Sequence, residues 1–275
     1  MAQEVYRELL INADNASAIC TANALELSES GKAFRKYFDG GTTGSAALKD
    51  EGKSQLFPTA AAIAHKVKSV MNGGYETMAG GSMTVSLKIG DIVRHSGSFS
   101  RGESEKALDN IPADNVAFSN AFEWDFNVRY NSQAYHITSC IIGLYFYQYS
   151  CAANAAGNGI ANTSVSNAAP YQGESVTFTA TVKPGATWHG WYSDAACTQL
   201  VSTSQSYTTA AADLTLYAKA TREVTGTGAY ARAGGQWAEA QDVYKKINGE
   251  WVLQTDNSYK TEMQNGNYKF EEVSE

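Results

Sequence analysis

The sequence predicts a mainly β protein with a minor α+β component. Two observations lead to this prediction: period-two alternation of apolar residues recurs along the chain, and the composition changes twice. The changes divide the 275 residues into an N-terminal sheet-rich α+β domain (1–150), a linker (151–163), a small all-β module (164–221) and a C-terminal β-hairpin segment (222–275). A chain of this length can form one large domain or two to three small ones of about 100–200 residues.

Three segments of the N-terminal domain have the pattern of strands. Apolar residues at 83, 85, 87 and 89 alternate with polar ones, as in a half-buried strand. Residues 122–128 alternate aromatic and aliphatic side chains with acidic and amide ones. Residues 136–150 supply a third, more continuously apolar strand. We therefore expect a core dominated by β-sheet.

Two other segments of this domain predict helices. Pro58 opens a stretch whose apolar residues fall at i, i+4, i+7 and i+8, and Gly73 supplies a residue that often ends a helix. These apolar residues are Ile63, Val67, Val70 and Met71. A second helical turn is expected around residues 32–38, ahead of a glycine-rich loop.

The stretch from 151 to 221 has five charged residues among 71. It opens with small residues typical of a linker, over 151–163. An all-β pattern follows, in which Val176, Phe178 and Ala180 alternate with Ser and Thr, and Lys-Pro-Gly at 183–185 predicts a turn.

Three motifs of this module resemble the Listeria-Bacteroides surface repeat, a bacterial Ig-like type of module. They are Gly-Trp-Tyr-Ser-Asp at 190–194, a Thr-Thr pair at 208–209 and Leu-Tyr-Ala-Lys at 216–219. The chain departs from the repeat at Ala220, where the repeat usually ends in Trp. Members of that family occur in bacterial surface adhesins and as appendages on phage virion proteins.

The resemblance implies that the Gly-Trp-Tyr aromatics pack the core of the module. We therefore expect Phe178, Trp191 and Leu216 in this core. An alternative is that Trp188 and Trp191, which flank His189, form a platform for sugar stacking. Possible surface contacts to glycans are Tyr171, Tyr207 and Trp188.

The C-terminal segment is more strongly charged, with 15 charged residues among the 54 from 222 to 275. Two Gly-Xaa-Trp corners, at Trp237 and Trp251, accompany an Asn-Gly pair at 248–249 that is a strong hairpin signal. This stretch resembles C-terminal tail segments of virion structural proteins from phages of gut bacteria.

No group of histidines or cysteines has the spacing of a metal site. His65, His95, His136 and His189 lie in separate contexts, with His65 expected to be exposed on a helix and His95 in a polar loop. We therefore expect no catalytic residue, no metal ligand and no cofactor.

The four cysteines, Cys20, Cys140, Cys151 and Cys197, are expected to be free thiols. The alternative, a Cys140–Cys151 disulfide, is disfavoured because a continuous strand between the two would hold them about 30 Å apart.

Glu123 and Asp125 lie on one face of a predicted strand. Two carboxylates about 5–5.5 Å apart suit a retaining glycosidase. Because Trp124 and its apolar neighbours must point inward, the acidic residues are expected to face solvent instead.

Charge and hydropathy exclude other functions. A net charge of −7 argues against a nucleic-acid partner, which would require clustered Lys and Arg. No run of about 18 apolar residues predicts a membrane span. The first 25 residues lack the basic start and apolar stretch of a secretory signal, so we expect a soluble protein made in the host cytoplasm.

These observations favour a non-enzymatic structural component of a phage particle, a viral protein of the tail or of the capsid surface. We expect a homo-oligomer that assembles with other virion proteins through residues 1–150 and displays the β modules outward, with weak attachment to host-surface glycans. One alternative is a fragment of a bacterial cell-surface adhesin. A third is a polysaccharide depolymerase.

Overall fold

In the computed structural model, the chain forms two compact units. The structure describes residues 2–29, 31–37, 43–75, 83–99, 105–128 and 134–222, and six short strands between 230 and 272. Unit 1 comprises Met1–Cys151, Asn167–Val176 and Thr208–Leu214, and unit 2 comprises Ala152–Ser166, Thr177–Tyr207 and Thr215–Glu275.

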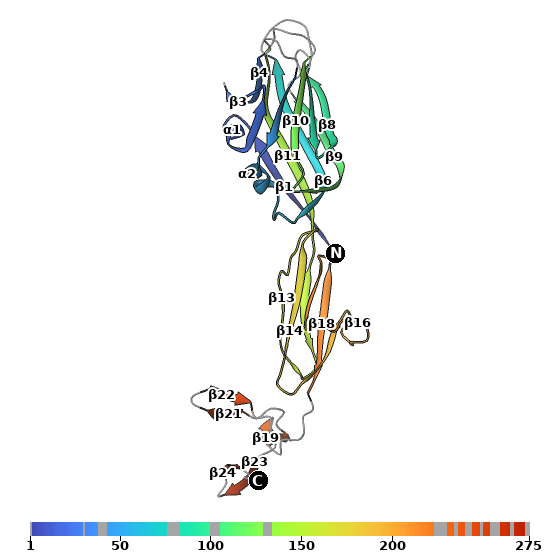
Figure 1. The fold of residues 1–275 in the computed structure, drawn as a ribbon. Coiled ribbons are helices and arrows are strands. Elements are labelled where there is room, and N and C mark those ends of the chain that lie inside the picture. Colours follow the sequence, from blue (N-terminus) through green and yellow to red (C-terminus); the bar gives the residue numbers. More distant parts are fainter. Residues whose placement is uncertain are drawn as a thin grey trace. The chain divides into compact units, whose positions relative to one another are not determined.

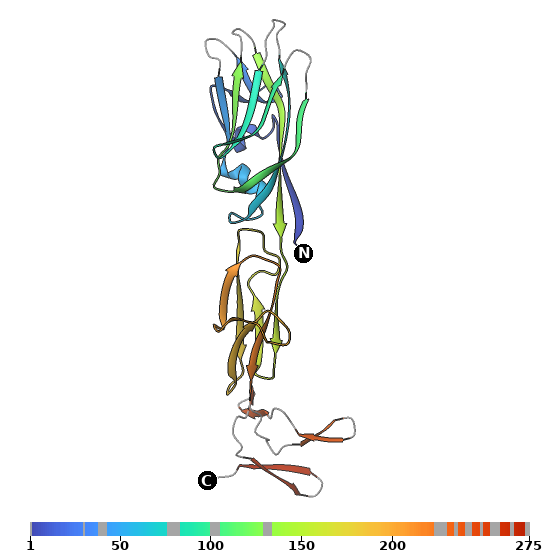
Figure 2. The same cartoon turned by 90° about the vertical axis from the view of Figure 1, so that its right-hand side faces the viewer.

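Unit 1 contains two antiparallel sheets that pack face to face (Figure 1, Figure 2). Sheet A has the order β3 (Glu26–Glu29), β4 (Lys32–Tyr37), β11 (Ala134–Gln148), β6 (Ile63–Tyr75) and β9 (Glu105–Ala117), and β1 (Gln3–Ile11) also pairs with β11. Sheet B has the order β2 (Cys20–Asn23), β5 (Thr43–Leu48), β10 (Phe122–Val128), β7 (Met83–Ile89) and β8 (Ile92–Phe99).

The core of unit 1 lies between these two sheets. Strand β7 buries every second residue, as its alternation predicts, and β10 turns Trp124 fully inward. The ring of Phe34, on β4 of sheet A, lies 5.5 Å from that of Trp124 and 5.7 Å from that of Phe126, centroid to centroid. The strands predicted at 83–89 and 122–128 are thus confirmed, and the aromatic side chains of β10 contact Phe34 of sheet A.

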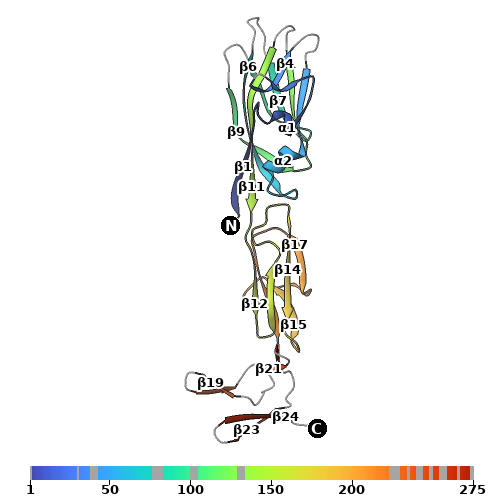
Figure 3. The same ribbon diagram turned by 90° about the vertical axis from the view of Figure 1, so that its left-hand side faces the viewer.

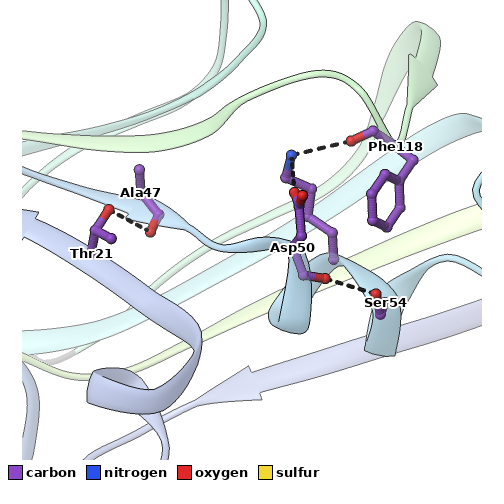
Figure 4. Close-up of polar contacts among 6 residues, drawn as sticks. Thr21, Ala47, Asp50, Ser54 and Phe118 are labelled. Atoms are coloured by element: carbon purple, nitrogen blue, oxygen red, sulfur yellow. Dashed lines mark hydrogen bonds and ion pairs between the residues drawn. The ribbon is translucent and has the colours of Figure 1, made fainter.

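Two short helices, α1 (Ala16–Ile19) and α2 (Asp50–Leu56), accompany the sheets. In α2, the Lys53 ammonium lies 3.0 Å from an Asp50 carboxylate oxygen and donates to the Phe118 carbonyl oxygen at 3.2 Å (Figure 4). Ser54 donates to the Asp50 carbonyl oxygen at 2.8 Å. The bond from Lys53 to Phe118 fastens α2 to the loop after β9. Neither helix, at four and seven residues, is long enough or apolar enough to cross a membrane.

The helix predicted from Pro58 to Gly73 is wrong, because residues 63–75 form strand β6. On its inward side β6 buries Ala64 and then, after an irregularity in its pairing, Val67, Ser69 and Met71. The helix-like spacing arises because apolar residues lie on both sides of the strand: Val67 and Met71 point inward, while Val70, opposite Ile141, is buried on the other side.

The helical turn predicted around residues 32–38 is also wrong. Strand β4 occupies 32–37 and forms a hairpin with β3 through Gly31, whose φ is +74°. Ala33 and Phe34 are adjacent and both buried, so this strand lacks strict alternation. Without alternation, this strand has no period-two pattern in the sequence.

Seven further strands form two small sheets in the repeat-like region. The four-stranded sheet has the order β12 (Cys151–Ala156), β18 (Leu214–Thr221), β15 (Thr187–Tyr192) and β16 (Leu200–Ser202), and the three-stranded sheet has the order β13 (Ile160–Val165), β14 (Ser175–Val182) and β17 (Ser206–Ala210).

Residues 151–163 are not a linker, because they form β12 and most of β13. The small residues there allow close packing. A Cβ added to Gly157 or Gly159 would lie within 3 Å of the backbone of Ala220. Glycine therefore marks close approach here, where the sequence suggested flexibility.

The sequence predicted one hairpin in the C-terminal segment, and the described residues of this segment form three antiparallel strand pairs. They pair β19 (Tyr230–Ala233) with β20 (Gln236–Glu239), β21 (Tyr244–Ile247) with β22 (Glu250–Leu253), and β23 (Tyr259–Gln264) with β24 (Asn267–Glu272). The side chains of Trp237 and Trp251 and the Asn-Gly pair at 248–249 lie outside the described residues.

Residues 167–176, called the strap below, belong to unit 1 although the sequence assigned them to the module. The Gln172 amide donates to the Tyr147 carbonyl oxygen at 2.9 Å, and the Ile63 amide donates to the Gln172 carbonyl oxygen at 2.8 Å. The Glu174 carboxylate accepts from the Thr59 hydroxyl at 2.6 Å. The strap therefore bonds to both β11 and β6.

Replacement of Gly173 tests this assignment. Its φ is +95°, and an added Cβ would lie 2.4 Å from the Ala61 carbonyl oxygen. Gly31, also in unit 1, has φ +74° but nothing within 4 Å of an added Cβ. Both Gly→Ala variants adopt the left-handed backbone at a cost of about 1–2 kcal/mol. We expect Gly173→Ala to lose about 1–3 kcal/mol more, through overpacking.

The measurement is the free energy of unfolding of unit 1 by chemical denaturation. Equal losses for Gly173→Ala and Gly31→Ala would contradict the inclusion of the strap in this cooperative unit.

Candidate functional site

Sheet A carries a cluster of tyrosines and charged residues on the side that faces away from the core. The cluster spans three neighbouring strands, β1, β11 and β6 (Figure 3). We call it the tyrosine face, and its members are Glu4, Tyr6, Glu8, Gly143, Tyr145, Tyr147, His65, Lys66 and Lys68.

Strand alternation places these residues on the outer side. In β1, Leu9 and Ile11 are buried, so Tyr6 and Glu8 point outward. In β11, Leu144 and Phe146 are fully buried, and the tyrosines between and after them point outward. The antiparallel register then sets Glu4 opposite Tyr147, Tyr6 opposite Tyr145, and Glu8 opposite Gly143.

Tyr6 leans across the face and covers Gly143. A Cβ added to Gly143 would lie 2.3 Å from the Tyr6 hydroxyl oxygen, so only glycine admits this side chain. The Tyr6 ring lies 4.7 Å from the Tyr145 ring, and its hydroxyl donates to a Glu8 carboxylate oxygen at 2.8 Å. Tyr6 nevertheless keeps 39% of its surface exposed. Its ring is therefore fixed and accessible.

A second set of contacts orders the neighbouring row. The His65 ring stacks on the Tyr147 ring with 3.8 Å between centroids and 2° between planes. Its Nε2 lies 2.9 Å from Glu4 Oε1, to which Lys66 Nζ also donates at 2.8 Å. The same ammonium lies 5.6 Å from the centre of the Tyr145 ring, within cation–π range.

These contacts hold the charged groups in their ionised forms. Hydrogen bonds from Lys66 and His65 lower the pKa of the Glu4 carboxyl below its usual range. The hydrogen bond to Glu4 raises the pKa of Lys66. A carboxylic acid that donates protons near neutral pH would need the opposite shift, so this arrangement suits binding better than acid–base chemistry.

The predicted glycan-contact residues are divided between the units: Tyr171 lies in unit 1, and Trp188 and Tyr207 lie in unit 2. Tyr171 lies on the strap, half-buried, and its ring lies 6.1 Å from that of Phe146, so it packs against the core of unit 1. Trp188 is half-buried, and its indole donates to the Thr203 carbonyl oxygen at 2.7 Å. Tyr207 is half-buried on β17.

Phe178, Trp191 and Leu216, the residues predicted for the module core, are each 0% exposed. The Trp191 ring lies 5.8 Å from that of Phe178 and 6.0 Å from that of Trp188, at a steep angle of 77° to Trp188. Two indoles in this edge-on arrangement, one of them buried, do not offer a flat platform to a sugar.

The environments of two histidines differ from those predicted. His65 lies on strand β6, and its side chain is 13% exposed, so it is neither helical nor free in solvent. His95 lies on β8, where its ring is buried and its Nδ1 is 3.0 Å from the Ser69 hydroxyl. His189 is half-buried, with Nε2 at 2.6 Å from the Thr221 hydroxyl, and His136 is half-buried on β11.

The acidic pair lies on the outer side of sheet B, as its alternation predicts. Glu123 and Asp125 are half-buried, while Trp124 between them is fully buried. Asp125 forms an ion pair with Lys88, and this contact raises the pKa of the Lys88 ammonium.

The four cysteines are free thiols, so the alternative Cys140–Cys151 disulfide is not formed. Burial raises the pKa of Cys20 to about 12, which disfavours the reactive thiolate. Within the described ranges, no group of three His, Cys, Asp or Glu side chains is placed to hold a metal ion.

Sequence reasoning missed the tyrosine face. The signal lay in the alternation of residues 3–11 and in Tyr145 and Tyr147 flanking Phe146. Only the pairing of β1 with β11 reveals that the two sets of outward residues meet.

Comparison with known proteins identifies a Listeria-Bacteroides repeat domain (List_Bact_rpt) at residues 154–219. No curated protein matches the chain.

Among solved structures, the chain is similar to the CBM36-1 domain of a multidomain xylanase from the hindgut metagenome of Trinervitermes trinervoides, at 10% identity and a TM-score of 0.31 over 51% of this chain and 96% of that one. It is similar to FLHE at 8% identity and a TM-score of 0.28, over 52% and 97% of the two chains. A family two carbohydrate esterase from Cellvibrio japonicus gives 5% identity and a TM-score of 0.29, over 56% and 40%. TM-scores this low support no inference about fold or function.

Burial of His95 predicts a dependence of stability on pH. Burial lowers the pKa of His95, so the folded state resists protonation that the unfolded chain accepts below about pH 6.5. Stability from the neutral ring is therefore complete above about pH 6.5 and declines as the pH falls below it. We expect His95→Gln to flatten this part of the stability–pH curve, measured by denaturation of unit 1 between pH 5 and 8. His189→Gln serves as the control, and identical curves for wild type and His95→Gln would contradict the argument.

Truncation of Trp191 tests the module core. We expect Trp191→Ala to lower the free energy of unfolding of unit 2 by about 3–5 kcal/mol, as for other buried aromatics. Trp188→Ala, which removes a half-buried ring, should cost less. A loss for Trp191→Ala below about 1 kcal/mol would be typical of a surface residue and would revive the sugar-platform hypothesis.

Proposed function

We propose that this chain, with its Listeria-Bacteroides repeat at 154–219, is a non-enzymatic structural component of a phage particle, on the tail or the capsid surface. It assembles through unit 1 and displays its β modules outward for weak attachment to host glycans. The resemblance of residues 234–256 to virion tail segments favours a location in the virion over a bacterial envelope.

The observation that carries the non-enzymatic part is the ionisation state of the candidate acid–base groups. Glu4 and Lys66 on the tyrosine face stabilise each other in their charged forms, and the hydrogen bond to Asp125 raises the pKa of Lys88. General acid–base catalysis is most efficient when a group titrates near the working pH. These groups are therefore better suited to holding a surface in place than to transferring protons.

Exposed apolar residues on a strand at the end of a sheet support self-assembly. Ile92 and Val93 are 48% and 51% exposed and lie on β8, which ends the order of sheet B. Burying such residues against a second copy removes apolar surface from water, which drives association. Edge strands also offer backbone groups for pairing between subunits.

The test is the mass and symmetry of the purified full-length protein, by mass photometry and electron microscopy. We expect a closed oligomer, and we expect Ile92→Lys combined with Val93→Lys to shift it toward monomer. A matched control introduces Lys at Leu200 and Val201 of unit 2, which are 54% and 37% exposed, and should leave the oligomer unchanged. A wild-type protein that stays monomeric at every concentration would contradict assembly.

The same preparation distinguishes the alternatives. Release of reducing sugar from host envelope, lost on Glu123→Gln or Asp125→Asn, would establish the depolymerase. Recovery of the protein from bacterial envelopes in cells that hold no particles would support the adhesin instead.

A further inference from the structure

We infer that the tyrosine face of unit 1 is a binding site for neutral glycans, with Tyr6 and Tyr145 as the stacking surface. The inference rests on the proposed attachment role and moves the contact away from Tyr171, Tyr207 and Trp188. It goes further by naming a site in unit 1 and the chemical class of its ligand.

The first argument is preorganisation of the rings. Tyr6 is held by its hydrogen bond to Glu8, and its ring fills the space above Gly143. The Tyr145 ring contacts both the Tyr6 ring and the Lys66 ammonium. A ring that is already fixed loses little conformational entropy when a ligand stacks on it. The C–H faces of a pyranose need an accessible aromatic ring, which Tyr6, 39% exposed, offers beside the half-buried Tyr145.

The second argument is the hydrogen-bonding capacity that surrounds the rings. Carboxylates of Glu4 and Glu8 lie at one side, and Lys68 is paired in register with Gly143 at the other. Carboxylate oxygens have several acceptor positions each, so Glu8 can accept from a sugar hydroxyl while it holds Tyr6. Acceptors therefore flank the stacking surface on the β1 side and a donor flanks it on the β6 side.

The third argument is charge, which selects a neutral ligand. The face carries two carboxylates, Glu4 and Glu8, and two ammonium groups, Lys66 and Lys68, so these charges balance. A site for sulfated, phosphorylated or sialylated chains would need an excess of cations. Because these four charges balance, they attract neither anionic nor cationic ligands at long range.

The same composition disfavours a second copy of the chain as the occupant. The centre of a subunit interface is depleted of Lys and Glu. Here both types lie within the cluster, and the exposed apolar Leu10 lies one row further along β1, opposite Ile141. Ile92 and Val93 on β8 offer a more apolar surface for assembly.

The test uses full-length protein and soluble hexasaccharides of glucose, galactose, mannose and N-acetylglucosamine, with sialylated and sulfated chains as anionic probes. Binding is followed by NMR titration and by calorimetry. We expect at least one neutral hexasaccharide to bind, and we expect Tyr6→Ala and Tyr145→Ala each to weaken it roughly ten-fold. Tyr145→Phe, which keeps the ring, should retain binding, and Tyr207→Ala in unit 2 should have no effect.

Thermal unfolding of each variant separates loss of the site from loss of the fold, and Tyr145→Phe keeps the test informative if Tyr145→Ala unfolds. Absence of binding to every neutral probe, preference for the anionic chains, or unchanged binding in Tyr6→Ala and Tyr145→Ala would each overturn the inference. Loss of the oligomer in Tyr6→Ala would show that a second copy of the chain occupies the tyrosine face, and it would also overturn the inference. Electron microscopy of the same samples reports on assembly separately. Glycan binding by a monomeric protein would contradict the proposed assembly and would still support the glycan site.

Discussion

The register of strand β11 is the constraint on which unit 1 depends. This strand pairs with β1, β4 and β6, and its alternate residues Ile142, Leu144 and Phe146 are fully buried. Burying each such side chain contributes roughly 1.5–3 kcal/mol. A slip of one residue would expose all three and bury Tyr145 and Tyr147. The core and the tyrosine face are therefore two consequences of one pairing.

The irregularity in β6 links the two sides of sheet A in the same way. Between Ala64 and Val67 the strand changes which positions point inward, and the residues at the change are His65 and Lys66. Both lie on the tyrosine face, where they bond to Glu4. A regular strand would point one of these neighbours inward. The bulge therefore allows two adjacent polar residues to serve the same outer surface.

Sequence reasoning succeeded where local pattern and tertiary structure agree. Strands β7 and β10 alternate strictly, so their faces could be predicted, and the repeat domain was recognisable from its motifs. It failed at β6, where apolar residues on both sides of an irregular strand imitate a helical period, and at β4, where Ala33 and Phe34 are both buried. The tyrosine face could not be predicted, because it joins residues 4–8 to residues 143–147 through a pairing that neither segment specifies alone.

The strap shows that a change in composition along the chain need not coincide with the boundary of a folded unit. From its low content of charged residues, the segment 167–176 was predicted to belong to the module. In the structure, the Tyr171 ring contacts Phe146 and the Glu174 carboxylate accepts a hydrogen bond from Thr59, both within unit 1. Gly173 allows the approach, since any side chain there would meet the Ala61 carbonyl oxygen. Unit 1 therefore acquires part of its stability from chain beyond residue 150. Because the strap bonds to β11 and β6 next to Tyr147 and His65, the order of the tyrosine face also depends on residues that the repeat domain contains.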